Sequence, residues 1–307
     1  MNSRKDPIAW RPVHGILLLD KPKGMTSNQA LQSTRRMFAA EKGGHTGSLD
    51  PLATGLLPIC FGEATKIAGY LLGAAKAYEA QVCLGITTTT ADADGEVLQL
   101  RRVPALDVVL LENELSTLRG RIRQIPPVYS AIKQGGVPLY KRARAGQDVQ
   151  APPREVEISR LDLLGFTETQ LRLHVECSSG TYVRSLATDL GEKLGCGAHL
   201  TGLRRLWVDP FLQPCMHSLE SLAAIARDGD QAALDALLLK VDDGLAAFPS
   251  IEVDVIQAQA LRLGQPVGCG AEPQELCRVL ESDHLIALGK IDQQGVLRVT
   301  RGLNLPR

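Results

Sequence analysis

Residues 44–66 read GHTGSLDPLATGLLPICFGEATK, and this stretch decides how the rest of the chain is arranged. Its glycines Gly44, Gly47 and Gly55 allow backbone angles and close approaches that a residue with a Cβ would resist. The apolar run 56–61 is typical of a short buried strand. The stretch therefore predicts a loop that can pass close to a ligand and that regular structure anchors on its C-terminal side.

The acid of this loop is Asp50. Pro51 disfavours the helical region for the residue before it, so Asp50 is expected in extended backbone, with its carboxylate held in place. Residues 63–72 have the spacing of a helix and provide a second anchor. Taken alone, the pattern is that of an ordinary turn aspartate, and a catalytic role needs further support.

Length and composition indicate a globular protein with one large and one small unit. The 307 residues suffice for a sizeable core, and 44% are hydrophobic while 22% are charged. The stretch 1–12 is polar, and no apolar run approaches the ~20 residues of a membrane span. The sequence therefore predicts a soluble, cytoplasmic protein that makes no membrane contact.

Cysteine and histidine usage argues against a metal site. The seven cysteines contain no Cys-x-x-Cys pair and the six histidines no His-x-x-x-His pair, which favours reduced thiols over a disulfide framework or zinc. Asp92 and Asp94 lack the further spaced ligands of a cation site, and Asp94-Gly95 indicates a hairpin turn. We therefore predict no metal.

The net charge is zero, but the charges are unevenly distributed. Residues 119–160 carry nine basic side chains against three acidic ones, whereas residues 219–255 carry eight acidic against two basic ones. The basic sector is suited to hold phosphates, and an acidic sector would orient the same polyanion by repulsion. For the acidic segment, a solvated face is the simpler interpretation. Glycines and prolines in the basic sector favour a protruding loop or short elements.

Periodicity predicts regular elements elsewhere in the chain. Thr26 followed by Gln29 resembles a capping box, and Gly120 and Gly195 are typical of helix ends. The predicted strands are 15–20, 77–85, 171–177, 277–280, 285–291 and 296–299, and the predicted helices are 26 to about 40, 106–119, 182–194 and 255–263, with two short helices within 218–239.

The loop closely resembles the signature of the tRNA pseudouridine synthase B family, which runs His-Thr-Gly, a small residue, then Leu-Asp-Pro-Leu-Ala-Thr-Gly. The match is free of gaps over residues 45–55. The resemblance implies that Asp50 is the catalytic nucleophile of uridine isomerisation in RNA, and that His45 touches the RNA near the flipped nucleotide. It also implies that Tyr78 stacks on the target base, although strand propensity alone would make Tyr78 a core residue.

Two downstream segments follow in the order of the family. In LRLHVECSSGTYVRSLATDLGEKLG, residues 171–195, Tyr182 and Arg184 fall near a strand-to-helix junction. The resemblance implies that Tyr182 packs in the pocket and that Arg184 forms an ion pair with the nucleophile. An arginine fork would keep that carboxylate ionised and aimed. In GCGAHLTGLRRLWV, residues 195–208, it implies that Leu203 lines the uridine pocket.

The resemblance further implies an α+β pseudouridine synthase fold, with a mixed, mainly antiparallel sheet flanked by helices and a small β-rich C-terminal PUA-like domain. The predicted parts are a tail at 1–12, a catalytic domain at 13–248 with an RNA-binding, thumb-like insertion at about 121–155, and a C-terminal RNA-binding domain at 249–307. Basic side chains are the candidate RNA contacts: Lys21, Lys133, Lys141, Arg142, Arg144, Arg154, Arg204 and Arg205.

The implied function is isomerisation of uridine 55 in the TΨC loop of tRNA by a monomer, without a cofactor or a guide RNA. The partner is the T-arm stem-loop, whose target base must be flipped into a pocket formed by Tyr78, Tyr182 and Leu203. A single carboxylate can either attack the sugar or remove a ribose proton to give a glycal, and the sequence does not choose between them.

Three alternatives stay open at this point. A guide-RNA-dependent pseudouridylase carries a related Leu-Asp-Pro motif, but such relatives have larger C-terminal RNA-binding parts. An RNA-binding or tRNA-folding protein without catalysis explains the basic sector but not the combination of Asp50, Tyr78 and Arg184. A nucleoside hydrolase shares the carboxylate, yet it has no need of a long basic loop.

Overall fold

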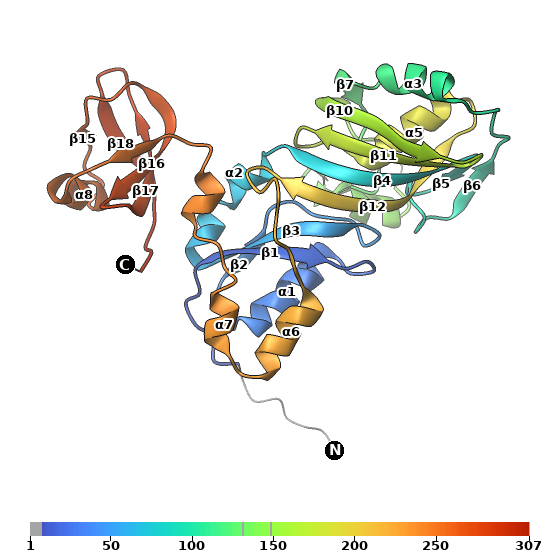
Figure 1. The fold of residues 1–307 in the computed structure, drawn as a ribbon. Coiled ribbons are helices and arrows are strands. Elements are labelled where there is room, and N and C mark those ends of the chain that lie inside the picture. Colours follow the sequence, from blue (N-terminus) through green and yellow to red (C-terminus); the bar gives the residue numbers. More distant parts are fainter. Residues whose placement is uncertain (1–7, 131, 148, 307) are drawn as a thin grey trace.

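The computed structural model describes residues 8–130, 132–147 and 149–306. A large mixed sheet with flanking helices forms the main body, and a second, smaller sheet follows near the C-terminus (Figure 1). The predicted fold class, α+β with a mainly antiparallel mixed sheet and a small β-rich C-terminal part, is confirmed. Among the described residues, no helix combines the length and the apolar character needed to cross a lipid bilayer.

The large sheet runs through the whole main body. Its neighbours are antiparallel except at the β1–β13 and β3–β12 pairs, which are parallel. The strands in spatial order are β13 (His217–Ser218), β1 (Gly15–Lys21), β3 (Thr54–Phe61), β12 (Ala198–Val208), β4 (Lys76–Leu84), β11 (Gln170–Cys177), β10 (Arg154–Phe166) and β7 (Gly120–Gln124), with β2 (Gly43–His45) paired to β3.

Strand β1 is buried on both faces of the sheet, which explains the continuous apolar run at 16–19. Successive side chains of a strand point to opposite faces. Leu17 and Leu19 accordingly enter the main core, whereas Ile16 and Leu18 enter a second core on the other face. The predicted buried strand is therefore confirmed, and it joins two hydrophobic layers.

Helices cover the face that contains the main core (Figure 1). The capping box at Thr26 and Gln29 opens α1 as predicted. The helices of the main body are α1 (Ser27–Met37), α2 (Ala68–Leu72), α3 (Val108–Ser116), α5 (Val183–Lys193), α6 (Leu219–Arg227) and α7 (Gln231–Asp235), of which α2 alone contributes to the second core among those described.

The helix expected over 63–72 is divided in two. A 3₁₀ turn, Gly62–Lys66, precedes α2. In a 3₁₀ turn the side chains three residues apart lie one above the other, and Lys66 Nζ forms an ion pair with Glu63 Oε2 at 2.6 Å. The backbone N–H of Asn304 donates to the same Glu63 oxygen at 2.7 Å, so a distant part of the chain also holds this turn.

Two smaller features project from the main sheet. One is the hairpin of β5 (Ile86–Thr88) and β6 (Val97–Leu100), whose connecting loop contains Asp94-Gly95 as predicted. The other is the insertion between β7 and β10, which carries β8 (Lys133–Gln134), β9 (Val137–Pro138) and α4 (Leu139–Arg144). The insertion has a small hydrophobic cluster of its own around Leu139, Val149 and Ala151.

The C-terminal sheet has the order β14 (Ser250–Glu252), β16 (Gln274–Glu281), β17 (His284–Ile291), β18 (Val296–Gly302) and β15 (Val267–Gly268), with α8 (Val255–Arg262) beside it. Its three longest strands and α8 are the elements that the sequence predicted here. Leu285, Leu288 and Leu303 pack into the second core together with residues of β1 and β3, so this sheet is joined to the main body by apolar contact.

Candidate active site

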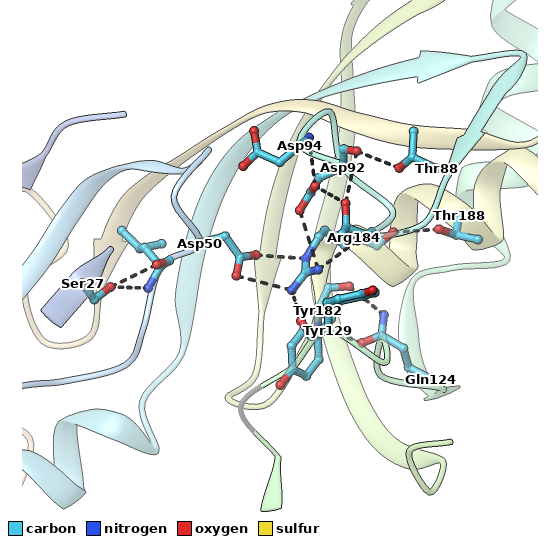
Figure 2. Close-up of polar contacts among 12 residues, drawn as sticks. Ser27, Asp50, Thr88, Asp92, Asp94, Gln124, Tyr129, Tyr182, Arg184 and Thr188 are labelled. Carbon is cyan, nitrogen blue, oxygen red and sulfur yellow. Dashed lines mark hydrogen bonds and ion pairs between the residues drawn. The ribbon is translucent and has the colours of Figure 1, made fainter. Parts of the chain in front are cut away.

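The loop between β2 and β3 presents Asp50. Leu49, the residue before Asp50, is held by Ser27, the first residue of α1. The Ser27 Oγ accepts from the N–H of Leu49 at 2.7 Å and donates to the Leu49 carbonyl at 3.1 Å. Figure 2 shows that the Asp50 carboxylate points from this clamp toward Arg184. The loop thereby fixes the backbone at the acid and leaves the Asp50 side chain 41% exposed.

Glycine is required where this loop enters β3. Gly55 has a φ of +93°, and a Cβ there would lie 2.2 Å from the carbonyl oxygen of Arg205 in β12. The close approach expected from the sequence is therefore present at Gly55. Gly47 also has left-handed backbone, with a φ of +96°, whereas a Cβ on Gly44 would meet no atom within 4 Å.

Arg184, in the first turn of α5, pairs with Asp50. Its Nε lies 2.9 Å from Asp50 Oδ2, without hydrogen-bond alignment, and its Nη2 donates to Asp50 Oδ1 at 3.3 Å. Its Nη1 and Nη2 also donate to the carbonyl oxygens of Thr90 and Tyr129, each at 2.9 Å. The Arg184 side chain is only 5% exposed. A guanidinium held at several points can orient a carboxylate in a way that a flexible ammonium group does not.

Asp92 is a second acid beside the same guanidinium, and the sequence did not point to it. Its Oδ2 lies 3.6 Å from Arg184 Nη1, and Figure 2 shows Arg184 between Asp50 and Asp92. Its other oxygen accepts hydrogen bonds from the Thr90 hydroxyl and the Asp94 N–H. The surrounding sequence has the composition of a turn, so only the folded arrangement identifies Asp92 as part of the site.

The proton affinity of Asp50 is shifted by this environment. Burial raises the pKa of the Asp50 carboxyl above that of an ordinary aspartate; Arg184 and Lys21 oppose this shift, and Asp92 and Asp94 add to it. A carboxylate with a raised pKa is more basic than an ordinary one, which suits a nucleophile or a general base.

The predicted pocket residues come from three different elements. Tyr78 lies in β4 opposite Arg205 of β12, and it is 8% exposed. Burial raises the pKa of the Tyr78 hydroxyl, so this side chain is a neutral phenol. Leu203 lies in β12 and packs, partly buried, against the main core. Tyr182 is the N-cap residue of α5, and the Arg154 guanidinium lies 5.1 Å from the centre of its ring.

His45 is the last residue of β2 and pairs with Ile59 of β3. Its ring is half-buried, and in the described part of the structure no group hydrogen-bonds to its buried Nδ1. Burial, assisted by the positive charge of Arg205, lowers the pKa of His45. The residue is therefore a neutral imidazole near neutral pH.

Two of the predicted RNA contacts are buried cations. Lys21 and Arg205 are 0% and 1% exposed. Lys21 Nζ donates to the carbonyl oxygens of Pro22 and Met25 at 2.8 and 2.6 Å, and Arg205 Nε donates to that of Leu56 at 2.6 Å. Burial lowers the pKa of Lys21 to about 8. Both side chains hold backbone around the site, and their charges are not presented at the surface.

Among the other basic candidates, those whose side chains the structure describes are partly or fully exposed. Arg204 donates to both carboxylate oxygens of Asp20, at 3.0 and 2.9 Å, and stays 41% exposed. In the insertion, Lys141 is exposed and Arg142 is half-buried. The side chains of the remaining candidates in the insertion lie outside the described part of the chain: Lys133 and Arg144.

Comparison with protein families gives matches along most of the chain. Residues 35–183 match the TruB family pseudouridylate synthase N-terminal domain. Residues 184–246 match the tRNA pseudouridylate synthase B C-terminal domain, and residues 249–303 match the C-terminal domain described as pseudouridine synthase II TruB.

Curated relatives are similar over nearly the full length. The chain is 54% identical to tRNA pseudouridine synthase B of Xanthomonas axonopodis pv. citri (strain 306), with 98% of each chain covered. It is 50% identical to the protein of that name from Stutzerimonas stutzeri (strain A1501), with 93% of this chain and 94% of the relative covered.

Solved structures support the fold. An archaeal box H/ACA sRNP Nop10–Cbf5 complex contains a chain that superposes with a TM-score of 0.72 at 22% identity, covering 99% of this chain and 90% of that one. The predictions of a pseudouridine synthase and of an isomerase are thereby confirmed by the family models and the curated relatives. The chain belongs to the TruB family of pseudouridylate synthases.

Proposed function

We propose that this chain converts uridine 55 in the TΨC loop of tRNA to pseudouridine, with Asp50 as the reacting carboxylate and without a guide RNA. The observation that carries the proposal is the ion pair of a partly exposed Asp50 with a buried Arg184, with Nε and Oδ2 2.9 Å apart. Relatives named tRNA pseudouridine synthase B cover the same length at 54% identity, which supports tRNA as the substrate. Such a substrate favours a cytoplasmic location.

The chemistry asks little of the protein beyond one well-placed carboxylate. The C1′–N1 bond breaks with its electron pair on uracil, the base turns, and C5 forms the new bond to C1′. The proton leaves C5 and N1 gains one, so no oxidant or reductant is consumed. Ionised Asp50 would either attack C1′ or remove a ribose proton, and its raised basicity suits both steps.

The target base must leave its stack to reach Asp50. We propose that Tyr78, Tyr182 and Leu203 line the pocket that receives it, and that His45 lies against the RNA beside the vacated position. The neutral, half-buried imidazole of His45 suits contact with a base or sugar more than with a phosphate.

The insertion and the C-terminal sheet complete the proposed RNA surface. The exposed Lys141 and the half-buried Arg142 are our candidates for phosphate contact in the insertion, which we place at about 121–155. We propose a catalytic domain at 13–248 and an RNA-binding C-terminal domain at 249–307. Because one chain supplies Asp50, Arg184 and Tyr182, a monomer would be sufficient for the reaction.

A guide-RNA-dependent reaction is the main competing interpretation. Two structures of H/ACA assemblies share the fold at 20% and 22% identity, which speaks for common architecture alone. The relatives at 54% identity are named for tRNA, which favours independence from a guide.

The experiment uses an unmodified T-arm stem-loop transcript labelled with tritium at C5 of uridine. Purified protein without any added guide RNA is expected to release one equivalent of tritium from this transcript, because C5 exchanges its hydrogen for the bond to the sugar. A matched transcript with cytidine at position 55 is expected to release none. Release that requires an added guide RNA, or that persists with the cytidine transcript, would contradict the proposed substrate.

A further inference from the structure

Gln124 has a buried side-chain amide, and both its oxygen and its nitrogen form hydrogen bonds with the backbone of Tyr182. It ends β7 and is 0% exposed. Its Oε1 accepts from the N–H of Tyr182 at 2.8 Å, and its Nε2 donates to the carbonyl of Tyr182 at 3.1 Å (Figure 2). A side-chain amide carries one acceptor and two donors, so Gln124 imitates the pairing of a neighbouring strand. This arrangement fixes the Tyr182 backbone in both directions.

Tyr182 is the point at which α5 begins. It is the N-cap residue, and its side chain forms no capping hydrogen bond to the helix. The first N–H groups of a helix lack partners within the helix, so the entry depends on outside contacts. Ser185 adds one, since its Oγ donates to the carbonyl of Ile125 at 2.7 Å. Because Arg184 lies in this first turn, a shift of the Tyr182 backbone would move Arg184 relative to Asp50.

The residue opposite Gln124 holds the other half of Tyr182. Arg154 pairs with Gln124 across β10 and β7, and its guanidinium lies 5.1 Å from the centre of the Tyr182 ring. One cross-strand pair thus contacts Tyr182 through both its backbone and its ring. The insertion leaves the sheet after Gln124 and returns to it at Arg154. The pair therefore forms the root of the insertion.

We propose that Gln124 is a positioning residue: its carboxamide fixes the Tyr182 backbone and, through the first turn of α5, sets Arg184 against Asp50. Gln124 lies at the root of the insertion. The insertion, which is expected to bind RNA, and the reacting carboxylate are therefore held in a fixed relative position. The inference rests on the proposed function and adds a residue that touches neither substrate nor Asp50.

The test replaces Gln124 with Met, which is similar in length but cannot form either hydrogen bond. The single-turnover rate of tritium release is expected to fall by about ten- to a hundredfold, since small misplacements near a reacting group have effects of this size. The Kd for the tRNA is expected to stay within about threefold, because no proposed phosphate contact is removed. A rate loss without an affinity loss separates positioning from a general weakening of the structure.

Gln231 provides the matched control. Its amide also joins two segments, accepting from Arg11 at 3.0 Å and donating to the Met37 carbonyl at 3.3 Å. Gln231 lies in α7, and these two bonds do not involve α5. Gln231→Met is expected to keep the parental rate. Gln124→Asn keeps the amide but is one methylene shorter, so it cannot hold both Tyr182 groups at the parental distances, and its rate is expected between those of the parent and Gln124→Met. This variant serves as the test if Gln124→Met does not fold.

The outcomes separate the two proposals. A folded Gln124→Met or Gln124→Asn protein with the parental rate would overturn the role of Gln124 and leave the proposed function standing. An affinity loss with an unchanged single-turnover rate would also overturn it. If the parent itself released no tritium from the transcript, the proposed function would fail, and this inference with it.

Discussion

Arg184 places its guanidinium between two carboxylates, with Asp50 at 2.9 Å and Asp92 at 3.6 Å. Both acids stabilise the guanidinium, and the negative charge of Asp92 raises the cost of ionising Asp50, because like charges in a shared site oppose one another. We infer that Asp92, which contacts Arg184, influences Asp50 in two ways. It holds the arginine that aims the acid, and its negative charge makes that acid more basic.

Replacing Asp92 with Asn tests both effects at once. The pKa of Asp50 is expected to fall, because a charge that helps to raise it is gone. The ionised acid is the reactive form, so the rate decreases as the pH falls through this pKa, and in Asp92→Asn that decrease is expected at lower pH than in the parent. The plateau rate is expected to drop by about tenfold because Arg184 is held less firmly.

Single-turnover tritium release measured over a pH series gives both quantities for Asp92. Asp94→Asn is a useful comparison, since Asp94 also raises the pKa of Asp50 but forms no ion pair with Arg184 in the described structure. It should shift the acid limb and spare the plateau. An Asp92→Asn profile that superposes on that of the parent would contradict this interpretation.

At the residue scale, the sequence predicts those site residues that lie in a recognisable motif. Asp50 was named from the family signature and Arg184 and Tyr182 from the downstream segment that resembles the family, and the structure brings them together. Asp92 and Gln124 could not be named this way. Their contacts arise when β7 and the β5–β6 loop fold against α5, and nothing in their local sequence distinguishes them from turn or strand residues.

The insertion between β7 and β10 is the element with the clearest electrostatic consequence. Its small cluster around Leu139 gives it internal packing, while the carbonyl of Tyr129 near its start accepts from Arg184 at 2.9 Å. An insertion anchored in this way can bind RNA phosphates without displacing Arg184 from Asp50. Four of the nine basic residues of the basic sector lie within it, namely Lys133, Lys141, Arg142 and Arg144.

Neutralising Lys141, Arg142 and Arg144 together by substitution with Gln should weaken tRNA binding and flatten its salt dependence. Each phosphate contact that is lost removes about one unit from the slope of log affinity against log salt concentration. Equilibrium binding between low and moderate salt measures that slope. Substituting the exposed Lys240, which lies in the acidic segment 219–255, serves as a comparison for a single charge elsewhere. A slope equal to that of the parent would show that these three charges do not meet phosphate.

Element boundaries follow the sequence where local signals agree with tertiary contacts. The capping box placed α1 correctly, and the alternation of 171–177 placed β11. The helix expected over 63–72 was wrong in one respect, because Glu63 and Lys66 stabilise a 3₁₀ turn that the chain end at Asn304 also contacts. Periodicity does not encode a contact to a residue so distant in the chain.

Across the whole molecule, the C-terminal sheet and the main body share a hydrophobic core. Leu288 of β17 is completely buried in the cluster that also contains Ile16 and Leu56. Polar contacts join the same parts, since Lys66 Nζ donates to the carbonyl of Gly302 at 2.9 Å. The two parts are therefore expected to stabilise one another.

Leu288→Ala should lower the free energy of unfolding by about 2–4 kcal/mol, the usual cost of a cavity left by a buried leucine. Chemical denaturation followed by circular dichroism measures the change. Leu263→Ala is the matched control because the same atoms are removed from a side chain that is 77% exposed, and a change within about 0.5 kcal/mol is expected. Equal effects of the two substitutions would argue against a shared core.

The central claim is that the ionised carboxylate of Asp50, aimed by Arg184, carries the isomerisation. The most direct measurement is single-turnover tritium release by Asp50→Asn, which keeps the side-chain shape and removes the charge. The rate is expected to fall by at least about 10⁴-fold, as for other essential nucleophiles, while tRNA affinity stays close to that of the parent. Release by Asp50→Asn at a rate near that of the parent would contradict the claim.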